Sequence, residues 1–397
     1  MKKLQFAYPA MILIIATLVS SCTPERKVQD EEIIIKDIVK TVKDKYSPDS
    51  RLAVMDIQTE RRSDQLVLKG EIDNPSAKQE LLVALEAKFP KRLLDSIAVL
   101  PDPKLGERTM GIVTNSVGNV RSKPGEAQEL SNQLLMGMVV KVLKQRAGYS
   151  YIQSSDRYLG WLDNFAIRFV TEAEANAWMS ASKVIVTSVT GTVREKATSE
   201  ALPVSDVVAA CLMKRTGENG TWRAVELPDG RKGYIERQAV QDYDSWKRTR
   251  TLNGTTVART AKSLLGIPYL WGGTSTKGMD CSGFTKTVYR LNGMELNRDA
   301  DEQATMGEPI ASDDNFKLLR SGDLLFFGQK GGNGTNERIT HVGIYLDNLQ
   351  FIHSSGRVRL SSFDPAAPNY EDRLLKRFVR ARRVVPQAQV PEVAKSR

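Results

Sequence analysis

Cysteine and histidine are scarce in this chain. Its 397 residues include three cysteines and only two histidines, His341 and His353. So few cysteines argue against a scaffold held by disulfides and against a zinc site built on paired Cys-x-x-Cys motifs. Two histidines argue equally against a metal centre rich in imidazole. Any chemistry that needs a thiol or an imidazole must therefore use very few residues.

Long hydrophobic stretches are also few. Hydrophobic residues make up 41% of the chain and charged residues 26%, with a mean hydropathy of −0.33. These values argue against a membrane protein with several spans and against a chain disordered throughout. The length predicts about two to four domains. The net charge of +10 permits a polyanionic partner, although a basic soluble surface accounts for it equally well.

The first 22 residues have the pattern of an export signal. Lys2 and Lys3 precede an apolar stretch, residues 10–19, that is too short to span a bilayer. The segment Val19-Ser20-Ser21-Cys22 then resembles the bacterial lipobox. That resemblance implies that Cys22 is lipidated and becomes the first residue of the mature protein. The alternative is an ordinary signal peptide with a chance cysteine.

This segment also predicts the location of the protein. Several acyl chains on Cys22 would anchor it stably to a membrane, on the side that faces the periplasm or cell wall. Thr23 stands where an aspartate favours retention in the inner membrane of some bacteria, so we expect the outer membrane. The export signal also argues against a nucleic-acid partner for the basic segment 373–383.

A tether and a small α/β domain are predicted over residues 23–106. Ile34, Ile35, Ile38, Val39 and Val42 recur at helical spacing up to Lys45. Residues 51–57 and 65–72 have the pattern of strands, and residues 81–89 that of a second helix. This region contains no chemical motif.

The middle of the chain contains an internal repeat. Gly118-Asn119-Val120-Arg121 recurs as Gly191-Thr192-Val193-Arg194, and Leu159-Gly160-Trp161-Leu162 as Lys232-Gly233-Tyr234-Ile235, both 73 residues later. A shared offset at two separate places indicates duplication. The short strands of each unit resemble bacterial SH3-like barrels, at 110–171 and 184–241, with a helical connector at 172–181. Such modules bind wall peptides or support a neighbouring catalytic domain.

Two cysteines remain beyond the export signal. Cys211 lies in the apolar run 207–213 and is expected to be a buried, inert thiol. Cys281 follows Asp280, a good N-cap, and begins a predicted helix whose amides would lower the pKa of its thiol. His341 and His353 lie on two predicted strands that meet at a turn near Asp347, so one imidazole can orient the other. This pattern predicts a hydrolase with a cysteine nucleophile and a histidine base.

Six ordered blocks make the C-terminal region recognisable. They are Pro268-Tyr269-Leu270-Trp271-Gly272-Gly273, Asp280-Cys281-Ser282-Gly283-Phe284, Arg298-Asp299, Gly322-Asp323-Leu324-Leu325-Phe326-Phe327, His341-Val342-Gly343-Ile344-Tyr345 and Phe351-Ile352-His353. Their order and spacing over residues 250–384 resemble the NlpC/P60 cysteine peptidases. The resemblance implies a papain-like α+β domain, followed here by a tail at 385–397. The whole chain is thus expected to be multidomain, with a small N-terminal α/β domain, two SH3-like β-barrels and this catalytic domain.

The resemblance also assigns roles to residues. It implies that Cys281 is the nucleophile, His341 the general base and acid, and His353 the polar third member. No metal or organic cofactor is needed for this chemistry. The implied substrate-binding residues are Tyr269, Asp280, Ser282, Arg298 and Asp299. Ala300 departs from the family, in which a serine often follows the Arg-Asp step.

Paired barrels ahead of such a domain resemble the γ-D-glutamyl-L-diamino acid endopeptidases of peptidoglycan. In those enzymes the first barrel closes the end of the active site that binds the amino terminus, which favours stem peptides with a free L-alanine. Here Glu129 and Tyr158 are the candidates for binding that ammonium group and shaping its pocket. A cell-wall-binding protein without catalysis, and an amidase or acyltransferase on the same fold, are the alternatives. The oligomeric state and the choice between diaminopimelate and lysine are left open.

Overall fold

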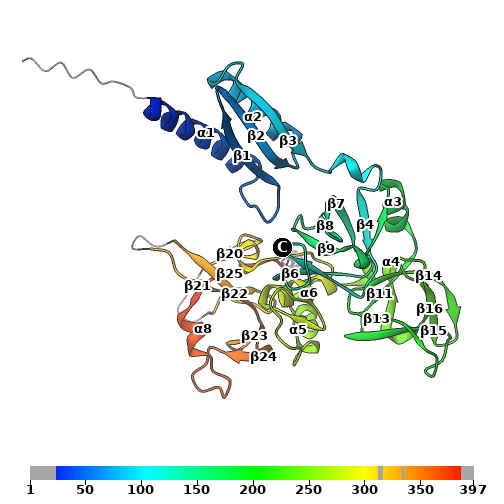
Figure 1. Ribbon diagram of the computed structural model, residues 1–397. Coiled ribbons are helices and arrows are strands. Elements are labelled where there is room, and N and C mark those ends of the chain that lie inside the picture. The colour runs from blue at the N-terminus through cyan, green and yellow to red at the C-terminus, as the bar shows by residue number, and fades with distance from the viewer. Residues whose placement is uncertain (1–23, 312–315, 333–335, 386–397) are drawn as a thin grey trace, which may run out of the picture.

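The computed structural model describes residues 24–311, 316–332 and 336–385. The lipobox with Cys22 and nearly all of the predicted tail lie outside these ranges. Figure 1 shows a small α/β domain at one end of the molecule, two all-β units beside each other, and a C-terminal α+β part next to them. None of the described helices is both long enough and apolar enough to cross a membrane.

The N-terminal domain packs two helices on one face of a three-stranded sheet. Its elements are α1 (Pro24–Tyr46), β1 (Met55–Arg62), β2 (Gln65–Ile72), α2 (Pro75–Lys88) and β3 (Leu93–Val99). Strand β2 is central, antiparallel to β1 and parallel to β3. The predicted strand at 51–57 is wrong in its first half, because residues 47–54 form a loop. The carbonyl of Arg51 in this loop accepts a hydrogen bond from the amide of Leu159 at 2.8 Å, outside the domain's own sheet.

The first all-β unit is a seven-stranded sheet that follows a short 3₁₀ turn, η1 (Pro103–Leu105). Its strands are β4 (Met110–Val113), β5 (Val117–Arg121), β6 (Leu130–Leu135), β7 (Val139–Arg146), β8 (Tyr149–Gln153), β9 (Leu159–Asp163) and β10 (Ile167–Val170), with η2 (Asn164–Ala166) before the last. Helix α3 (Glu172–Ser180) follows as the predicted connector.

The second all-β unit also has seven strands. They are β11 (Lys183–Val186), β12 (Thr190–Arg194), β13 (Pro203–Val208), β14 (Leu212–Asn219), β15 (Trp222–Glu226), β16 (Lys232–Glu236) and β17 (Val240–Asp242), with η3 (Arg237–Ala239) before the last. Helix α4 (Tyr243–Thr249) ends the unit.

The two units share one topology. The first sheet runs β10-β4-β7-β8-β9-β5-β6, and the second runs β17-β11-β14-β15-β16-β12-β13 in the same direction. At each position in the sheet, the two units therefore have strands that correspond in chain order. The 73-residue repeat in the sequence is thus a duplicated fold, and we call the units barrel 1 and barrel 2.

The C-terminal part packs helices against a six-stranded antiparallel sheet of order β20-β25-β21-β22-β23-β24. Its helices are α5 (Gly254–Ser263), α6 (Cys281–Leu291), α7 (Ala300–Gln303) and α8 (Asp372–Lys376). Its sheet strands are β20 (Glu308–Ile310), β21 (Leu324–Gln329), β22 (Arg338–Tyr345), β23 (Gln350–Ser355), β24 (Arg357–Ser362) and β25 (Phe378–Arg383). The short hairpin of β18 (Thr274–Ser275) and β19 (Gly278–Met279) precedes α6.

Barrel 1 is joined to the C-terminal part through that hairpin. The amide of Thr274 donates to Gln133 Oε1 at 3.1 Å, and its hydroxyl donates to the Gln133 carbonyl at 2.7 Å. Gly272 lies in the same contact with φ +77°, and a Cβ there would fall 2.2 Å from the carbonyl oxygen of Leu130. This close approach requires glycine and fixes barrel 1 beside the start of α6.

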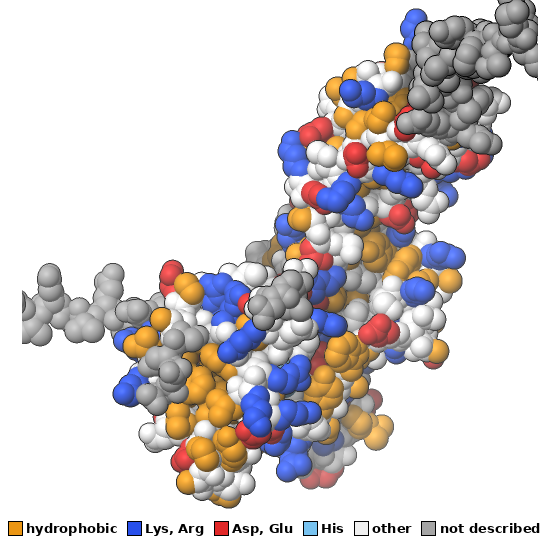
Figure 2. All heavy atoms as spheres, turned by 90° about the vertical axis from the view of Figure 1, so that its left-hand side faces the viewer, with side chains coloured by type: hydrophobic (Ala, Val, Ile, Leu, Met, Phe, Trp, Pro, Cys, Tyr) orange, Lys and Arg blue, Asp and Glu red, His pale blue; other side chains and the backbone are white. Residues whose placement is uncertain are grey.

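Figure 2 shows the molecule from the side, with the N-terminal domain projecting from the remainder. Blue lysine and arginine side chains are spread over this face among red acidic ones. Charges of both signs are therefore interspersed on the visible side.

Candidate active site

The predicted nucleophile lies at the first residue of a helix. Cys281 begins α6, and the side chain of Asp280 caps that helix by accepting a hydrogen bond from the amide of Gly283 at 2.7 Å. The N–H of Val342 on β22 hydrogen-bonds the thiol. Cys281 is 9% exposed and lines an open cleft of about 730 Å³, so a substrate can reach it.

The two histidines are in direct contact. His341 on β22 and His353 on β23 lie near the turn that joins these strands, and His341 Nε2 is 2.8 Å from His353 Nδ1. The other ring nitrogen of His353 is 3.0 Å from Ser361 Oγ on β24. Because the Nε2 atom of His341 is occupied, its Nδ1 atom is left for the nucleophile. The residue that touches the thiol, Val342, directly follows His341.

Burial opposes charge on all three side chains. It raises the pKa of the Cys281 thiol to about 12, and the nearby Asp280 carboxylate raises it further. Burial also lowers the pKa of His341 to about 4, with Arg377 and Arg373 adding to the effect. For His353 burial is again the main cause, followed by His341, and the pKa falls to about 2. The resting site therefore holds a neutral thiol and neutral imidazoles.

This result corrects the expected lowering of the Cys281 pKa. The amide of Val342 on β22 and the amide of Ser282 at the start of α6 do lower it, but burial and Asp280 outweigh them. The thiol consequently needs His341 to take its proton during attack, because it is not ionised beforehand.

Tyr269 lies in the same cleft as the nucleophile. Burial raises the pKa of its phenol to about 12, and the nearby Cys281 is the next cause. The phenol therefore stays protonated at neutral pH and can donate a hydrogen bond to an oxyanion.

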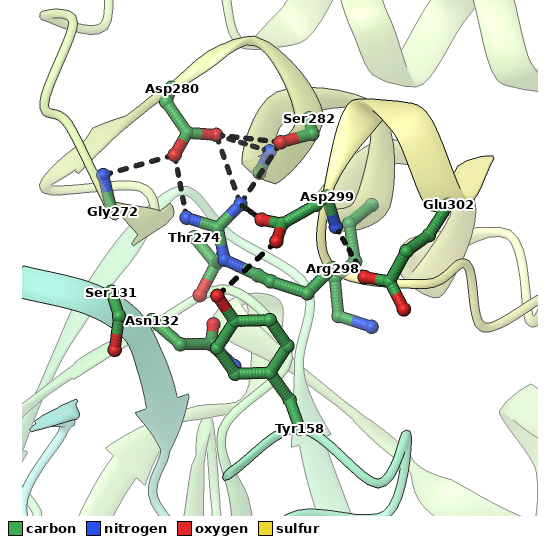
Figure 3. A network of polar contacts seen from close by, with 12 residues as sticks. Ser131, Asn132, Tyr158, Gly272, Thr274, Asp280, Ser282, Arg298, Asp299 and Glu302 are labelled. Atoms are coloured by element: carbon green, nitrogen blue, oxygen red, sulfur yellow. Dashed lines mark hydrogen bonds and ion pairs between the residues drawn. The ribbon is translucent and has the colours of Figure 1, made fainter. Parts of the chain in front are cut away.

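Asp280, Ser282 and Arg298 line the cleft and form one buried network, whose contacts Figure 3 shows. Arg298 donates to Asp280 Oδ2 at 2.6 Å and to Ser282 Oγ at 3.0 Å. The same Asp280 oxygen accepts from the amide of Gly272 at 3.0 Å. Asp280 and Ser282 were expected to contact the peptide. In the structure their polar side-chain atoms bond to each other and to Arg298. They brace the start of α6 and the preceding loop.

Barrel 1 supplies one wall of the cleft. Glu129 Oε1 accepts a hydrogen bond from the indole N–H of Trp271 at 2.9 Å. The Tyr158 hydroxyl donates to Asp299 Oδ2 at 3.3 Å, as Figure 3 shows. Glu129, Tyr158 and Asp299 all line the same cleft as Cys281. The structure therefore brings the predicted residues of two domains together.

Three neighbours of this site were missed from the sequence. Trp271 lies in the first of the six sequence blocks but carries no assigned role there, and Ser361 belongs to an ordinary strand pattern. Arg51 comes from the N-terminal domain and also lines the cleft. Only Trp271 had a signal in the sequence. The described residues contain no group of three or more His, Cys, Asp or Glu side chains that could hold a metal ion.

Family models match two parts of the chain. The NlpC/P60 family model matches residues 266–383, and the model of the bacterial dipeptidyl-peptidase SH3 domain matches residues 120–167. The first range contains the cysteine and both histidines, and the second lies within barrel 1. The N-terminal domain is outside both ranges.

Several curated relatives of this chain are named as peptidases. Dipeptidyl-peptidase 6 of Lysinibacillus sphaericus is 27% identical over 279 residues, which cover 66% of this chain and 95% of the relative. The γ-D-glutamyl-L-lysine dipeptidyl-peptidase of Bacillus cereus is 27% identical over 271 residues, 66% of this chain and 77% of the relative. A murein DD-endopeptidase/LD-carboxypeptidase of Escherichia coli is 38% identical over 126 residues, 31% of this chain and 58% of the relative.

A solved structure shows the same fold. The crystal structure of an NlpC/P60 family protein from Bacillus cereus has a TM-score of 0.59 at 22% identity and covers 70% of this chain and all of that one. The chain is thus a cysteine peptidase. It carries an NlpC/P60 domain preceded by a bacterial dipeptidyl-peptidase SH3 domain.

Proposed function

We propose that this protein hydrolyses the γ-D-glutamyl-L-diamino acid bond of peptidoglycan stem peptides that carry a free N-terminal L-alanine. The main support is the cleft in which Cys281 of the peptidase domain faces Glu129 and Tyr158 of barrel 1. The name of the Bacillus cereus relative, a γ-D-glutamyl-L-lysine dipeptidyl-peptidase, supports the same bond.

The cysteine would act with the help of one histidine. His341 takes the thiol proton while Cys281 Sγ attacks the γ-carbonyl carbon, and Tyr269 donates to the resulting oxyanion. The C–N bond then breaks, and His341 gives its proton to the departing amine of the diamino acid. Water, deprotonated by His341, attacks the thioester, and the C–S bond breaks to return the thiol.

A carboxylate in the lining of the cleft suits the ammonium group of L-alanine. Glu129 Oε1 already accepts from Trp271, which fixes the carboxylate while its second oxygen is left for the substrate. A blocked amine would lose the charge-assisted hydrogen bond and would meet the wall formed by barrel 1.

The test compares tripeptides with free and N-acetylated L-alanine, analysed by mass spectrometry. We expect L-Ala-D-Glu and the free diamino acid from the first peptide and at least tenfold slower cleavage of the second. Equal cleavage of both peptides would refute the free-amine requirement. Cleavage of D-Ala cross-links, in a parallel digest of cross-linked muropeptides, would instead favour the activity named for the Escherichia coli relative.

We also propose that Cys22 carries a lipid anchor, with outer-membrane sorting. The support is the lipobox-like segment that ends at Cys22 and the wall substrate proposed above. Labelling cells with a tagged fatty acid should mark the protein and should fail for Cys22→Ala. Equal labelling of that variant would contradict the anchor.

A further inference from the structure

The N-terminal domain places one side chain in the active-site cleft. Arg51 lies in the loop between α1 and β1, and its guanidinium lines the cleft with Tyr158, Asp299 and Asp301. Arg51 Nη1 donates to Asp299 Oδ2 at 2.6 Å and to Asp301 Oδ1 at 3.0 Å. This loop therefore reaches the peptidase domain 248 residues further along the chain.

Every N–H of this guanidinium is engaged. Arg51 Nη2 donates to Asp301 Oδ2 at 2.9 Å and to Asp49 Oδ2 at 2.6 Å, and Nε donates to Asp49 Oδ1 at 3.0 Å. One cation is thus shared by three carboxylates in a fork geometry that lysine cannot reproduce. Arg51 has no donor left for a substrate, so its effect must act through the carboxylates that it holds.

Barrel 1 fixes the loop from the other side. The amide of Leu159 donates to the Arg51 carbonyl at 2.8 Å, and Gln153 Nε2 donates to the Leu52 carbonyl at 2.8 Å. Val54 packs with Leu159 in a small apolar cluster between the two domains. The guanidinium is therefore held in place from both ends.

Asp299 is the carboxylate that this arrangement presents to the cleft. Its Oδ2 atom accepts from Arg51 and from the Tyr158 hydroxyl, and Oδ1 is 3.8 Å from Arg298 Nη1. The Asp299 carboxylate also caps α7 in a capping box with Glu302. Burial raises the pKa of Asp299, and the charges of Arg298 and Arg51 oppose that rise. Arg51 thus favours an ionised Asp299 in the lining of the cleft.

We propose that Arg51 is a positioning residue for substrate specificity: it holds Asp299 beside Tyr158 so that the carboxylate binds the free ammonium group of the substrate. The N-terminal domain thereby takes part in choosing the substrate. This inference rests on the proposed function, since it concerns the same ammonium-binding end of the cleft.

Binding measurements can test this without hydrolysis. In the Cys281→Ala background, calorimetry would compare the dipeptide L-Ala-γ-D-Glu with its N-acetyl form. We expect Arg51→Met to weaken binding of the free-amine dipeptide by about tenfold and binding of the N-acetyl form by less than twofold. Arg51→Lys keeps the charge and loses the fork geometry. Its affinity for the free-amine dipeptide should lie between those of the parent and of Arg51→Met.

A matched control is Arg62→Met. Arg62 is an exposed arginine on β1 that pairs with Glu60 within the same domain, so its variant should bind like the parent.

The pH dependence gives a second readout: with Arg51→Met the loss of affinity on acidification should begin at higher pH, because Asp299 then protonates more readily. A merely structural contact would not shift this profile.

Three results would overturn the inference. They are unchanged affinity of Arg51→Met for the free amine, equal losses for both dipeptides, and tighter binding of the free amine, which would make Arg51 a competitor for Asp299. The proposed function fails separately, if the unmutated enzyme does not cleave the tripeptide at the γ-D-glutamyl bond.

Discussion

Burial controls the protonation of the catalytic side chains. The thiol of Cys281 and both imidazoles are neutral at rest, since each would lose hydration on gaining a charge. His341 is therefore available as a base well below the pH at which an ordinary histidine becomes protonated. The reactive form is the neutral Cys281 thiol with the neutral His341 imidazole. Charge develops on these two groups only as the proton moves from one to the other.

Alkylation of Cys281 by iodoacetamide should follow this picture. Because the thiol pKa is raised to about 12, the thiolate fraction at pH 7 is very small and grows about tenfold with each pH unit. The labelling rate, measured on the Cys281 peptide by mass spectrometry, should therefore still be rising between pH 7 and 10. A rate that reaches its plateau below pH 7 would show a preformed thiolate and contradict the account.

Ser361 is expected to set the tautomer of His353. Its hydroxyl is 3.0 Å from His353 Nε2 and is fully buried, so it can accept the proton on that nitrogen and leave Nδ1 to accept from His341. We predict that Ser361→Ala lowers kcat about tenfold with little change in KM.

Ser362→Ala is the matched control for this effect. Ser362 is equally buried, but its hydroxyl is directed to the carbonyl of Leu349 at 3.4 Å. Equal losses of kcat in the two variants would mean that the hydroxyl of Ser361 has no particular role.

Helix α6 is the element that connects chemistry with domain packing. Its first residue is the nucleophile, and one turn later Lys286, only 2% exposed, is 2.9 Å from Asp156 Oδ2 of barrel 1. Lys286 is also 2.7 Å from Glu295 Oε1. A single buried ammonium thus holds the helix, the following loop and barrel 1 together.

Removal of that ammonium should be costly. Lys286→Met leaves the buried carboxylate of Asp156 without its cation, while the exposed Glu295 keeps its ion pair with Arg290. We expect a loss of about 3–5 kcal/mol in the free energy of unfolding, measured in urea. The control is Lys262→Met on α5, an exposed lysine, which should change stability by less than about 0.5 kcal/mol. A similar small change for Lys286→Met would show that this cluster is not stabilising.

At the level of the whole molecule, three domains surround one cleft. Local patterns predicted its parts: Asp280 as the cap of α6, the two histidines beside a turn, and the duplicated barrels from the 73-residue offset. These features depend on neighbouring residues or on repetition, so a sequence displays them. Glu129 and Tyr158 came from the family resemblance, and the structure places both in the cleft.

The remaining features depend on contacts distant in sequence. No local pattern links Arg51 to Asp299, because the pair forms only when the N-terminal domain packs on barrel 1. The thiol pKa was misjudged for a related reason. A helix start is visible in the sequence, whereas the depth of burial that outweighs it is set by the folded sheet and the adjoining barrel.

The central claim is that the sulfur of Cys281 cleaves one particular amide bond. The most direct test is mass spectrometry of L-Ala-γ-D-Glu-meso-diaminopimelate after incubation with the enzyme and with Cys281→Ala. The account predicts L-Ala-D-Glu and diaminopimelate with the enzyme, and intact tripeptide with the variant. Equal digestion by Cys281→Ala, or release of L-alanine in place of the dipeptide, would contradict it.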